Sequence, residues 1–148
     1  MILLEANLKL ILPVALLGVM VLFFIYRMYK MRHLLTSDNG PEESEHTLVI
    51  TDANFEKTIA KGITLIDFWA PWCAPCRIQG PIINDLANDM VGKAQIGKLD
   101  VDQNKRVSAK LGIRNIPTIF IFKDGEIVKQ LVGVKPKPTL IKEIENYL

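Results

Sequence analysis

Two cysteines separated by two residues are the part of this sequence that most directly suggests chemistry. Cys73 and Cys76 are the only cysteines among the 148 residues, and they frame the sequence Cys-Ala-Pro-Cys. Cysteines that staple a small secreted fold occur in larger numbers and at wider spacing. A pair this close instead favours a reversible disulfide, in which one thiolate attacks and the other completes the exchange. The pair therefore predicts redox chemistry.

Local sequence predicts that Cys73 lies where a strand is followed by a helix. Residues 63–69 form a largely apolar run typical of a strand, and apolar residues recur at helical spacing from Ile78 to Met90. At the start of a helix, unpaired N–H groups and the helix dipole stabilise an anion and so lower the pKa of a cysteine thiol. We therefore expect Cys73 to attack as a thiolate at neutral pH. Cys76, one turn later, is expected to lie deeper.

A metal site is the competing interpretation of such a cysteine pair. A closed zinc site usually takes two such pairs, or one pair with two histidines. His33 and His46 lie before the predicted domain, and Arg77 stands where a haem-attachment motif carries histidine. We therefore expect no metal.

The net charge of +2, without a block of like charge, also gives no indication of nucleic-acid binding.

Residues 47–148 predict one α/β domain with strands and helices in the order βαβαβαββα. Residues 118–122 are apolar on both faces, which is typical of a central strand, and an Asp-Gly pair after them indicates a tight hairpin. Helices that alternate with strands imply a mixed central sheet flanked by helices. Asp52 and Asn104 are each expected to cap the helix that follows them.

The N-terminal segment, residues 1–33, predicts a transmembrane anchor with a basic flank. Residues 10–26 carry no charge, and as a helix they would span roughly 25 Å of a hydrocarbon core about 30 Å thick. Membrane contact is expected over residues 8–29, with tyrosines near the far end. A cleaved signal peptide is the alternative. It is disfavoured because the basic residues follow the apolar run and no small-residue cleavage site comes after it.

The segment between the anchor and the domain predicts a tether. Residues 34–46 are polar, contain a Gly-Pro pair and show no apolar period, so a flexible linker is expected. Lys and Arg are more frequent after the apolar run than before it. The positive-inside rule then favours a single-pass protein with its domain on the cytoplasmic side, while the outer face stays open as an alternative.

The sequence around the cysteines resembles the thioredoxin family. The residues that carry the resemblance run in order through the predicted domain: Asp67-Phe68-Trp69-Ala70, Trp72-Cys73, Pro75-Cys76, Pro81, Lys98-Leu99-Asp100-Val101-Asp102, Gly112-Ile113-Arg114, Ile116-Pro117-Thr118, Gly125 and Gly133. The resemblance implies a thioredoxin fold after the transmembrane helix. It also implies that the Cys73–Cys76 disulfide works without any other cofactor. Ala74 stands where thioredoxins usually carry glycine, and Ala74 and Pro75 would tune the redox potential.

Asp67 is a further candidate for the chemistry. It shares a strand face with Leu65 and Trp69, so its carboxyl group is expected to point into the core, where burial raises its pKa. The alternative is a purely structural aspartate. The family resemblance implies that Asp67 relays protons to and from Cys76, and that Lys98 lies near Asp67 and modulates it.

The resemblance also implies a substrate-binding surface beside the cysteines. Trp72 would shape the docking surface. The Ile116–Pro117 bond would be cis and lie against the cysteine pair, so that the Ile116 backbone can pair with an extended substrate segment. Gly133 would leave room for that segment.

Together these features predict a thiol–disulfide oxidoreductase that reduces disulfides in partner proteins. Its electrons would come from a flavin-dependent thioredoxin reductase on the cytoplasmic side, or from a membrane electron donor if the domain faces outward. Two alternatives remain: a disulfide oxidant or isomerase on the outer face, and a membrane-tethered docking module that needs neither cysteine.

Overall fold

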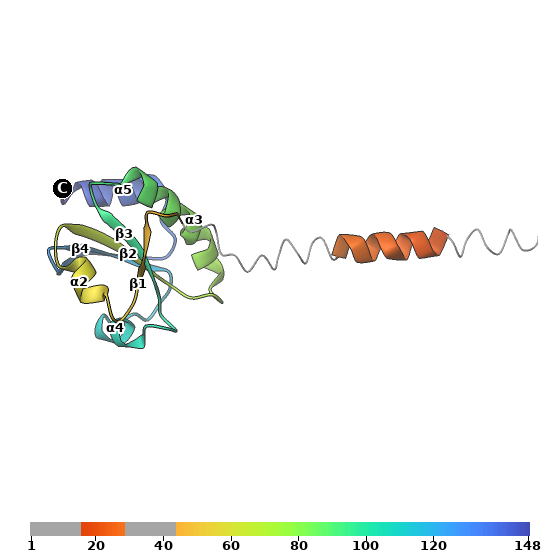
Figure 1. Ribbon diagram of the computed structural model, residues 1–148, viewed down its shortest axis with the longest axis horizontal. Coiled ribbons are helices and arrows are strands. Elements are labelled where there is room, and N and C mark those ends of the chain that lie inside the picture. The colour runs from red at the N-terminus through yellow and green to blue at the C-terminus, as the bar shows by residue number, and fades with distance from the viewer. Residues whose placement is uncertain (1–15, 29–43) are drawn as a thin grey trace, which may run out of the picture. The chain divides into compact units, whose positions relative to one another are not determined.

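The computed structural model describes residues 16–28 and 44–148. The chain divides into two compact units between Asn39 and Gly40. In the first unit, residues 16–28 form a helix with exposed side chains, drawn in orange in Figure 1. No helix within these two ranges is both long enough and apolar enough to cross a bilayer. The remainder of the predicted anchor and residues 34–43 of the predicted linker lie outside the described residues.

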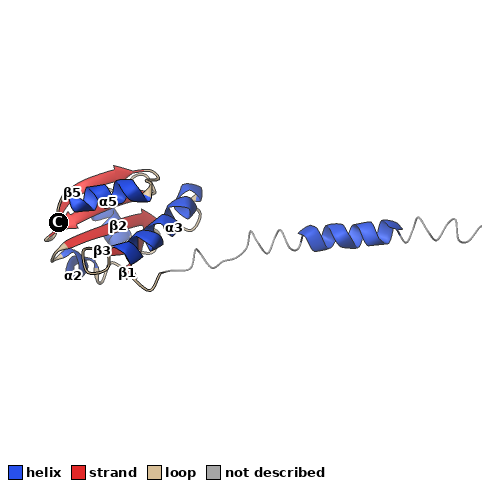
Figure 2. Ribbon diagram, turned by 90° about the horizontal axis from the view of Figure 1, so that it is seen from above, coloured by secondary structure: helices blue, strands red, loops and turns tan. Residues whose placement is uncertain are grey.

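The second unit is a five-stranded mixed sheet with helices on both faces, as the sequence predicts (Figure 2). The strand order is β1-β3-β2-β4-β5; β1, β3 and β2 run parallel, and β4 and β5 are antiparallel to their neighbours. The strands are β1 (Thr47–Ile50), β2 (Ile63–Trp69), β3 (Gln95–Asp100), β4 (Thr118–Lys123) and β5 (Glu126–Val132). The helices are α2 (Phe55–Ile59), α3 (Ala74–Asp89), α4 (Lys105–Lys110) and α5 (Lys137–Glu145).

Two apolar cores lie on opposite faces of the sheet. Because side chains alternate along a strand, Leu65 of β2 packs with α3 and α5, whereas Ile66 packs with α2 and α4. Every residue from Thr118 to Phe122 in β4 is buried, which confirms the prediction of a strand covered on both faces. The two cores cover both faces of β2, which lies at the centre of the sheet between β3 and β4.

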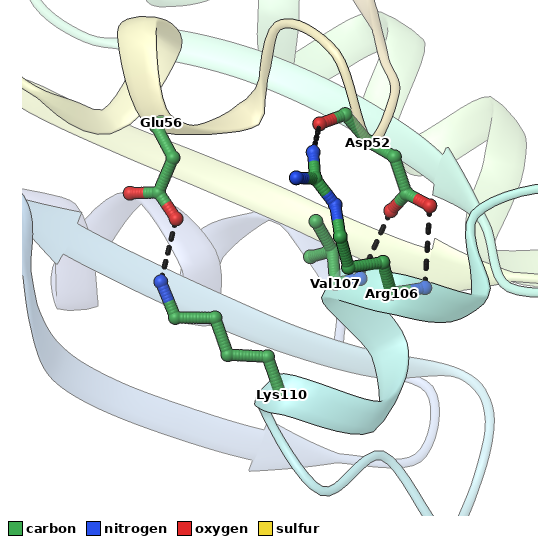
Figure 3. A network of polar contacts seen from close by, with 5 residues as sticks. All are labelled: Asp52, Glu56, Arg106, Val107 and Lys110. Carbon is green, nitrogen blue, oxygen red and sulfur yellow. Dashed lines mark hydrogen bonds and ion pairs between the residues drawn. The ribbon is translucent and has the colours of Figure 1, made fainter.

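Helix capping differs from the local prediction. Asp52 does not cap α2; instead its carboxylate accepts hydrogen bonds from the backbone N–H groups of Arg106 (3.2 Å) and Val107 (2.9 Å) at the start of α4 (Figure 3). The Asn104 side chain likewise does not cap α4, because its Oδ1 accepts from the Asp52 N–H at 2.8 Å. The two side chains therefore join segments that are 52 to 55 residues apart in sequence.

Sheet topology determines where the cysteines lie. The carboxyl end of β2 leads into the turn before Cys73, and β4 begins directly after Pro117. Since β2 and β4 are antiparallel, with Phe68 opposite Thr118, the end of one strand and the start of the other meet at the same edge of the sheet. Segments about 50 residues apart in sequence thus converge beside the cysteines.

Candidate active site

Cys73 and Cys76 form a disulfide at the start of α3, with their Cα atoms 5.3 Å apart. Cys73 is the N-cap residue of α3, and its sulfur accepts a hydrogen bond from the backbone N–H of Cys76 at 3.2 Å. Pro75 falls in the first turn, where its missing N–H removes no helical bond. The Cys73 sulfur therefore lies at the positive end of the α3 dipole and receives a backbone N–H donor there.

The two cysteines are buried to the same degree. Cys73 is 3 % exposed and Cys76 is 4 % exposed, so the expectation that Cys76 lies deeper is wrong. Both pack with Ala70, and Trp69 and Ile116 cover this cluster. The chemical difference between the two sulfurs comes from the helix: Cys73 receives the N–H donor, and Cys76 lies within the first turn.

Asp67 lies in the interior of β2, as its position in the strand predicts. Its side chain is 0 % exposed, and within the described residues neither carboxyl oxygen has a hydrogen-bond partner. Loss of solvation disfavours the charged form and raises the pKa of Asp67 from 3.8 to about 7, although the positive charge of Lys98 lowers it. The carboxyl group is thus balanced between its acid and its anion near neutral pH.

Lys98 is the buried cation beside this acid. It lies on β3 directly opposite Asp67 in the strand register. Its Nζ is 4.6 Å from the centroid of the Trp69 ring, a cation–π distance. The aromatic face and the neighbouring carboxyl group together stabilise a charge that is largely removed from water.

The Ile116–Pro117 peptide bond is cis, which confirms the expectation drawn from the family resemblance. Ile116 packs against the cysteine cluster, and the carbonyl oxygen of Pro117 accepts a hydrogen bond from the Gly133 N–H at 2.8 Å. Gly133 has φ = 79°, a conformation that side chains disfavour. The loop before β4 and the segment after β5 are therefore joined beside the disulfide.

Trp72 is 67 % exposed, directly before Cys73. Its indole Nε1 donates a hydrogen bond to Asp102 at 2.7 Å, which fixes one edge of the ring. The sequence pattern by itself indicates no role for Asp102. The signal was its place just after β3, because parallel β2 and β3 end at the same edge of the sheet.

Gln79 was also missed. It follows Cys76 by one turn of α3, is 0 % exposed, and bonds to the backbone of Lys135. A polar residue at an inward position of the helix was the only signal in the sequence.

Among the residues that the structure describes, no three or more His, Cys, Asp and Glu side chains are grouped to hold a metal ion. That this protein uses no metal stays a prediction.

Comparisons with known proteins agree with this geometry. The thioredoxin family model matches residues 46–146. A thioredoxin of Staphylococcus saprophyticus is 48 % identical over 99 residues, which are 67 % of this chain and 95 % of the relative. A thioredoxin of Staphylococcus aureus is 44 % identical over the same share of each chain. In the solved structures, the Malassezia sympodialis thioredoxin gives a TM-score of 0.62 at 30 % identity, covering 68 % of this chain and 90 % of that one.

Proposed function

The chain belongs to the thioredoxin family, and on that premise we propose how it works as a thiol–disulfide oxidoreductase and where it does so. Its reaction is the reduction of protein disulfides by the Cys73–Cys76 pair. The observation that carries this function is the position of Cys73. It caps α3, is disulfide-bonded to the next cysteine, and accepts the Cys76 N–H. That arrangement stabilises a thiolate at one sulfur and places its resolving partner within bonding distance.

The cycle begins with the reduced pair. The Cys73 thiolate attacks one sulfur of a substrate disulfide, which forms a mixed disulfide and releases the other substrate sulfur as a thiolate. Cys76 loses its proton and attacks the Cys73 sulfur, which breaks the mixed disulfide and frees the second substrate thiolate. The substrate gains two electrons, and the Cys73–Cys76 disulfide present in the structure is the product.

Asp67 is the proposed acceptor of the Cys76 proton. Burial raises its pKa to about 7, so at neutral pH it can take up a proton and later return it. Its two oxygens have no hydrogen-bond partner among residues 44–148, which leaves them free to bind that proton or a water that carries it. Lys98 modulates this exchange because its charge favours the ionised carboxylate.

The surface around the disulfide is the proposed docking site for substrate. The Ile116 backbone would pair with an extended segment of the partner protein, Gly133 would leave space for it, and Trp72 would cover it from the other side. Ala74 and Pro75, between the cysteines, would set the redox potential. The docking roles are supported by two contacts: Ile116 packs against the cysteine cluster, and Gly133 is hydrogen-bonded to Pro117 in the adjoining loop.

The membrane is the proposed site of action. Residues 16–28 include exposed apolar side chains around the whole helix, a pattern that favours an apolar environment over water. The basic residues that follow favour the cytoplasmic side, where a thioredoxin-reductase-type flavoprotein would supply electrons. A domain on the outer face would instead need a membrane electron donor.

The chain enters the domain away from the edge of the sheet that bears the disulfide. Ser44 donates a hydrogen bond to Asn88 near the end of α3, and β1 begins at Thr47, beside Ile96. Asn88 follows Cys76 by a helical rise of roughly 18 Å. The entry point therefore lies toward the amino ends of the parallel strands, and the edge that bears the disulfide is left free for substrate.

Insulin reduction by the full-length chain in detergent tests the function. With a chemical reductant as electron source, wild type should precipitate the insulin B chain, and Cys73→Ser should lose this activity while keeping its unfolding transition. Asn88→Ala is a matched control because it removes a hydrogen bond of the same helix away from the disulfide. Near-normal activity of Cys73→Ser would refute the assignment.

A further inference from the structure

The Gln79 side chain is one of the buried polar groups of the domain. It lies on α3 one turn after Cys76 and is fully buried. Its Oε1 accepts a hydrogen bond from the Lys135 backbone N–H at 2.7 Å, and its Nε2 donates to the Lys135 backbone carbonyl at 3.3 Å. A side-chain amide thus pairs with one residue's backbone N–H and carbonyl together, as a neighbouring strand would.

This bond fixes the segment that follows β5 to the active-site helix. The same segment is fixed at a second point, where the Gly133 N–H donates to the Pro117 carbonyl. Residues 133–135 are therefore held between the loop that contains the cis-proline and the helix that contains the disulfide. Lys135 itself is only half-buried, so without Gln79 water could bind its backbone groups and the segment could move away.

We propose that Gln79 is a positioning residue for substrate docking. It holds residues 133–135 at a fixed distance from the Cys73–Cys76 pair, so that the surface on which a protein substrate docks is formed before the substrate arrives. Pre-ordered loops bind more tightly because less conformational entropy is lost on binding. This inference rests on the docking role proposed above for Gly133, and it adds no step to the thiol exchange itself.

The side-chain chemistry explains why glutamine suits this position. One amide supplies both the acceptor and the donor that the Lys135 backbone requires. Methionine has a similar length and volume but can supply neither bond, whereas asparagine lacks the methylene group needed to reach from the helix. Gln79→Met therefore removes the attachment without opening a cavity.

Kinetics with two substrates test the proposal. For Gln79→Met in the full-length chain, the KM for insulin should rise at least roughly fivefold while kcat changes little. Roughly fivefold corresponds to the net contribution of one hydrogen bond, and the substitution removes two. The rate with a small aromatic disulfide, which needs no docking surface, should stay within about twofold of wild type. Asn88→Met, on the far half of the same helix, should leave both substrates unchanged. Equal losses for both substrates, or no change with insulin, would overturn the proposal.

Amide hydrogen exchange tests the attachment independently of activity. In wild type the Lys135 and Gly133 amides should be protected. In Gln79→Met the Gly133 amide, whose own acceptor on Pro117 is intact, should exchange about tenfold faster if the whole segment is released. Unchanged exchange at Gly133 would show that Gln79 does not hold the segment. Faster exchange with unchanged insulin kinetics would show that the segment is not part of the docking surface, and loss of insulin reduction in wild type would instead refute the proposed function.

Discussion

Replacing Asp67 by asparagine gives a test in which stability and activity change in opposite directions. Asparagine has nearly the shape of a protonated aspartic acid but cannot ionise. Asp67 is fully buried, and within the described part of the chain its oxygens lack hydrogen-bond partners. The folded protein therefore tolerates the neutral acid better than the anion, and the substitution removes only the cost of ionisation.

The size and sign of the effect follow from the pKa. In the folded protein Asp67 has a pKa of about 7, compared with 3.8 for an unperturbed aspartate. Between these pH values the folded state keeps its proton while the unfolded state has lost it, so the free energy of unfolding falls as pH rises. The shift corresponds to about 4 kcal/mol, which is lost by the time the pH has passed the folded value. The asparagine variant does not have this loss.

Urea unfolding of the oxidised protein at several pH values measures the difference. Wild type and Asp67→Asn should be nearly equal at a pH below 3.8, because Asp67 is then mostly protonated in the unfolded state as well as in the folded state. The variant should become more stable by about 4 kcal/mol near pH 8. Insulin reduction by Asp67→Asn should nevertheless slow near neutral pH, because no group accepts the Cys76 proton.

Lys98→Met is the matched second variant. The positive charge of Lys98 lowers the pKa of Asp67. Removing that charge should raise the pKa of Asp67 further and extend the loss of stability to higher pH. A difference between wild type and Asp67→Asn that does not depend on pH would refute the reasoning. A less stable Asp67→Asn at every pH would mean that the carboxylate has a structural partner.

The other predictions concern the exchange, the capping network and topology. Cys76→Ser should accumulate mixed disulfides with partner proteins through Cys73, and reductant should release them, whereas Cys73→Ser should trap far less; equal trapping on non-reducing gels would contradict the assigned order of attack. Asp52→Ala should lower the free energy of unfolding by about 1–2 kcal/mol because two N–H groups of α4 lose their acceptor, and an unchanged urea midpoint would contradict this. Protease added to intact cells should leave the domain of residues 47–148 uncut if it faces the cytoplasm, and cleavage without lysis would place it outside.

Features that depend on near neighbours in the sequence could be predicted. The order βαβαβαββα follows from apolar periodicity, which each segment carries by itself. The same holds for Cys73 at the start of α3, because a strand, a short turn and a helix follow one another directly there. The inward orientation of Asp67 also follows from strand alternation alone.

A side chain with two possible partners cannot be placed from its neighbours in the sequence. Asp52 precedes α2 and could have capped it, but the fold brings α4 beside it, and the carboxylate bonds there instead (Figure 3). The expected difference in depth between Cys73 and Cys76 failed for a similar reason. Burial depends on which residues cover the pair, and Ile116 comes from a loop 40 residues away.

The sequence by itself determined the class of fold, the reactive pair and the chemistry of that pair. Only the tertiary structure decided that Gln79 reaches Lys135, that Trp72 bonds to Asp102, and that the Pro117 carbonyl accepts from Gly133. These contacts join residues 16 to 56 positions apart. The register of β2 against β3 brings Trp72 beside Asp102, and the register of β4 against β5 brings Pro117 beside Gly133. No periodicity within one segment encodes either register.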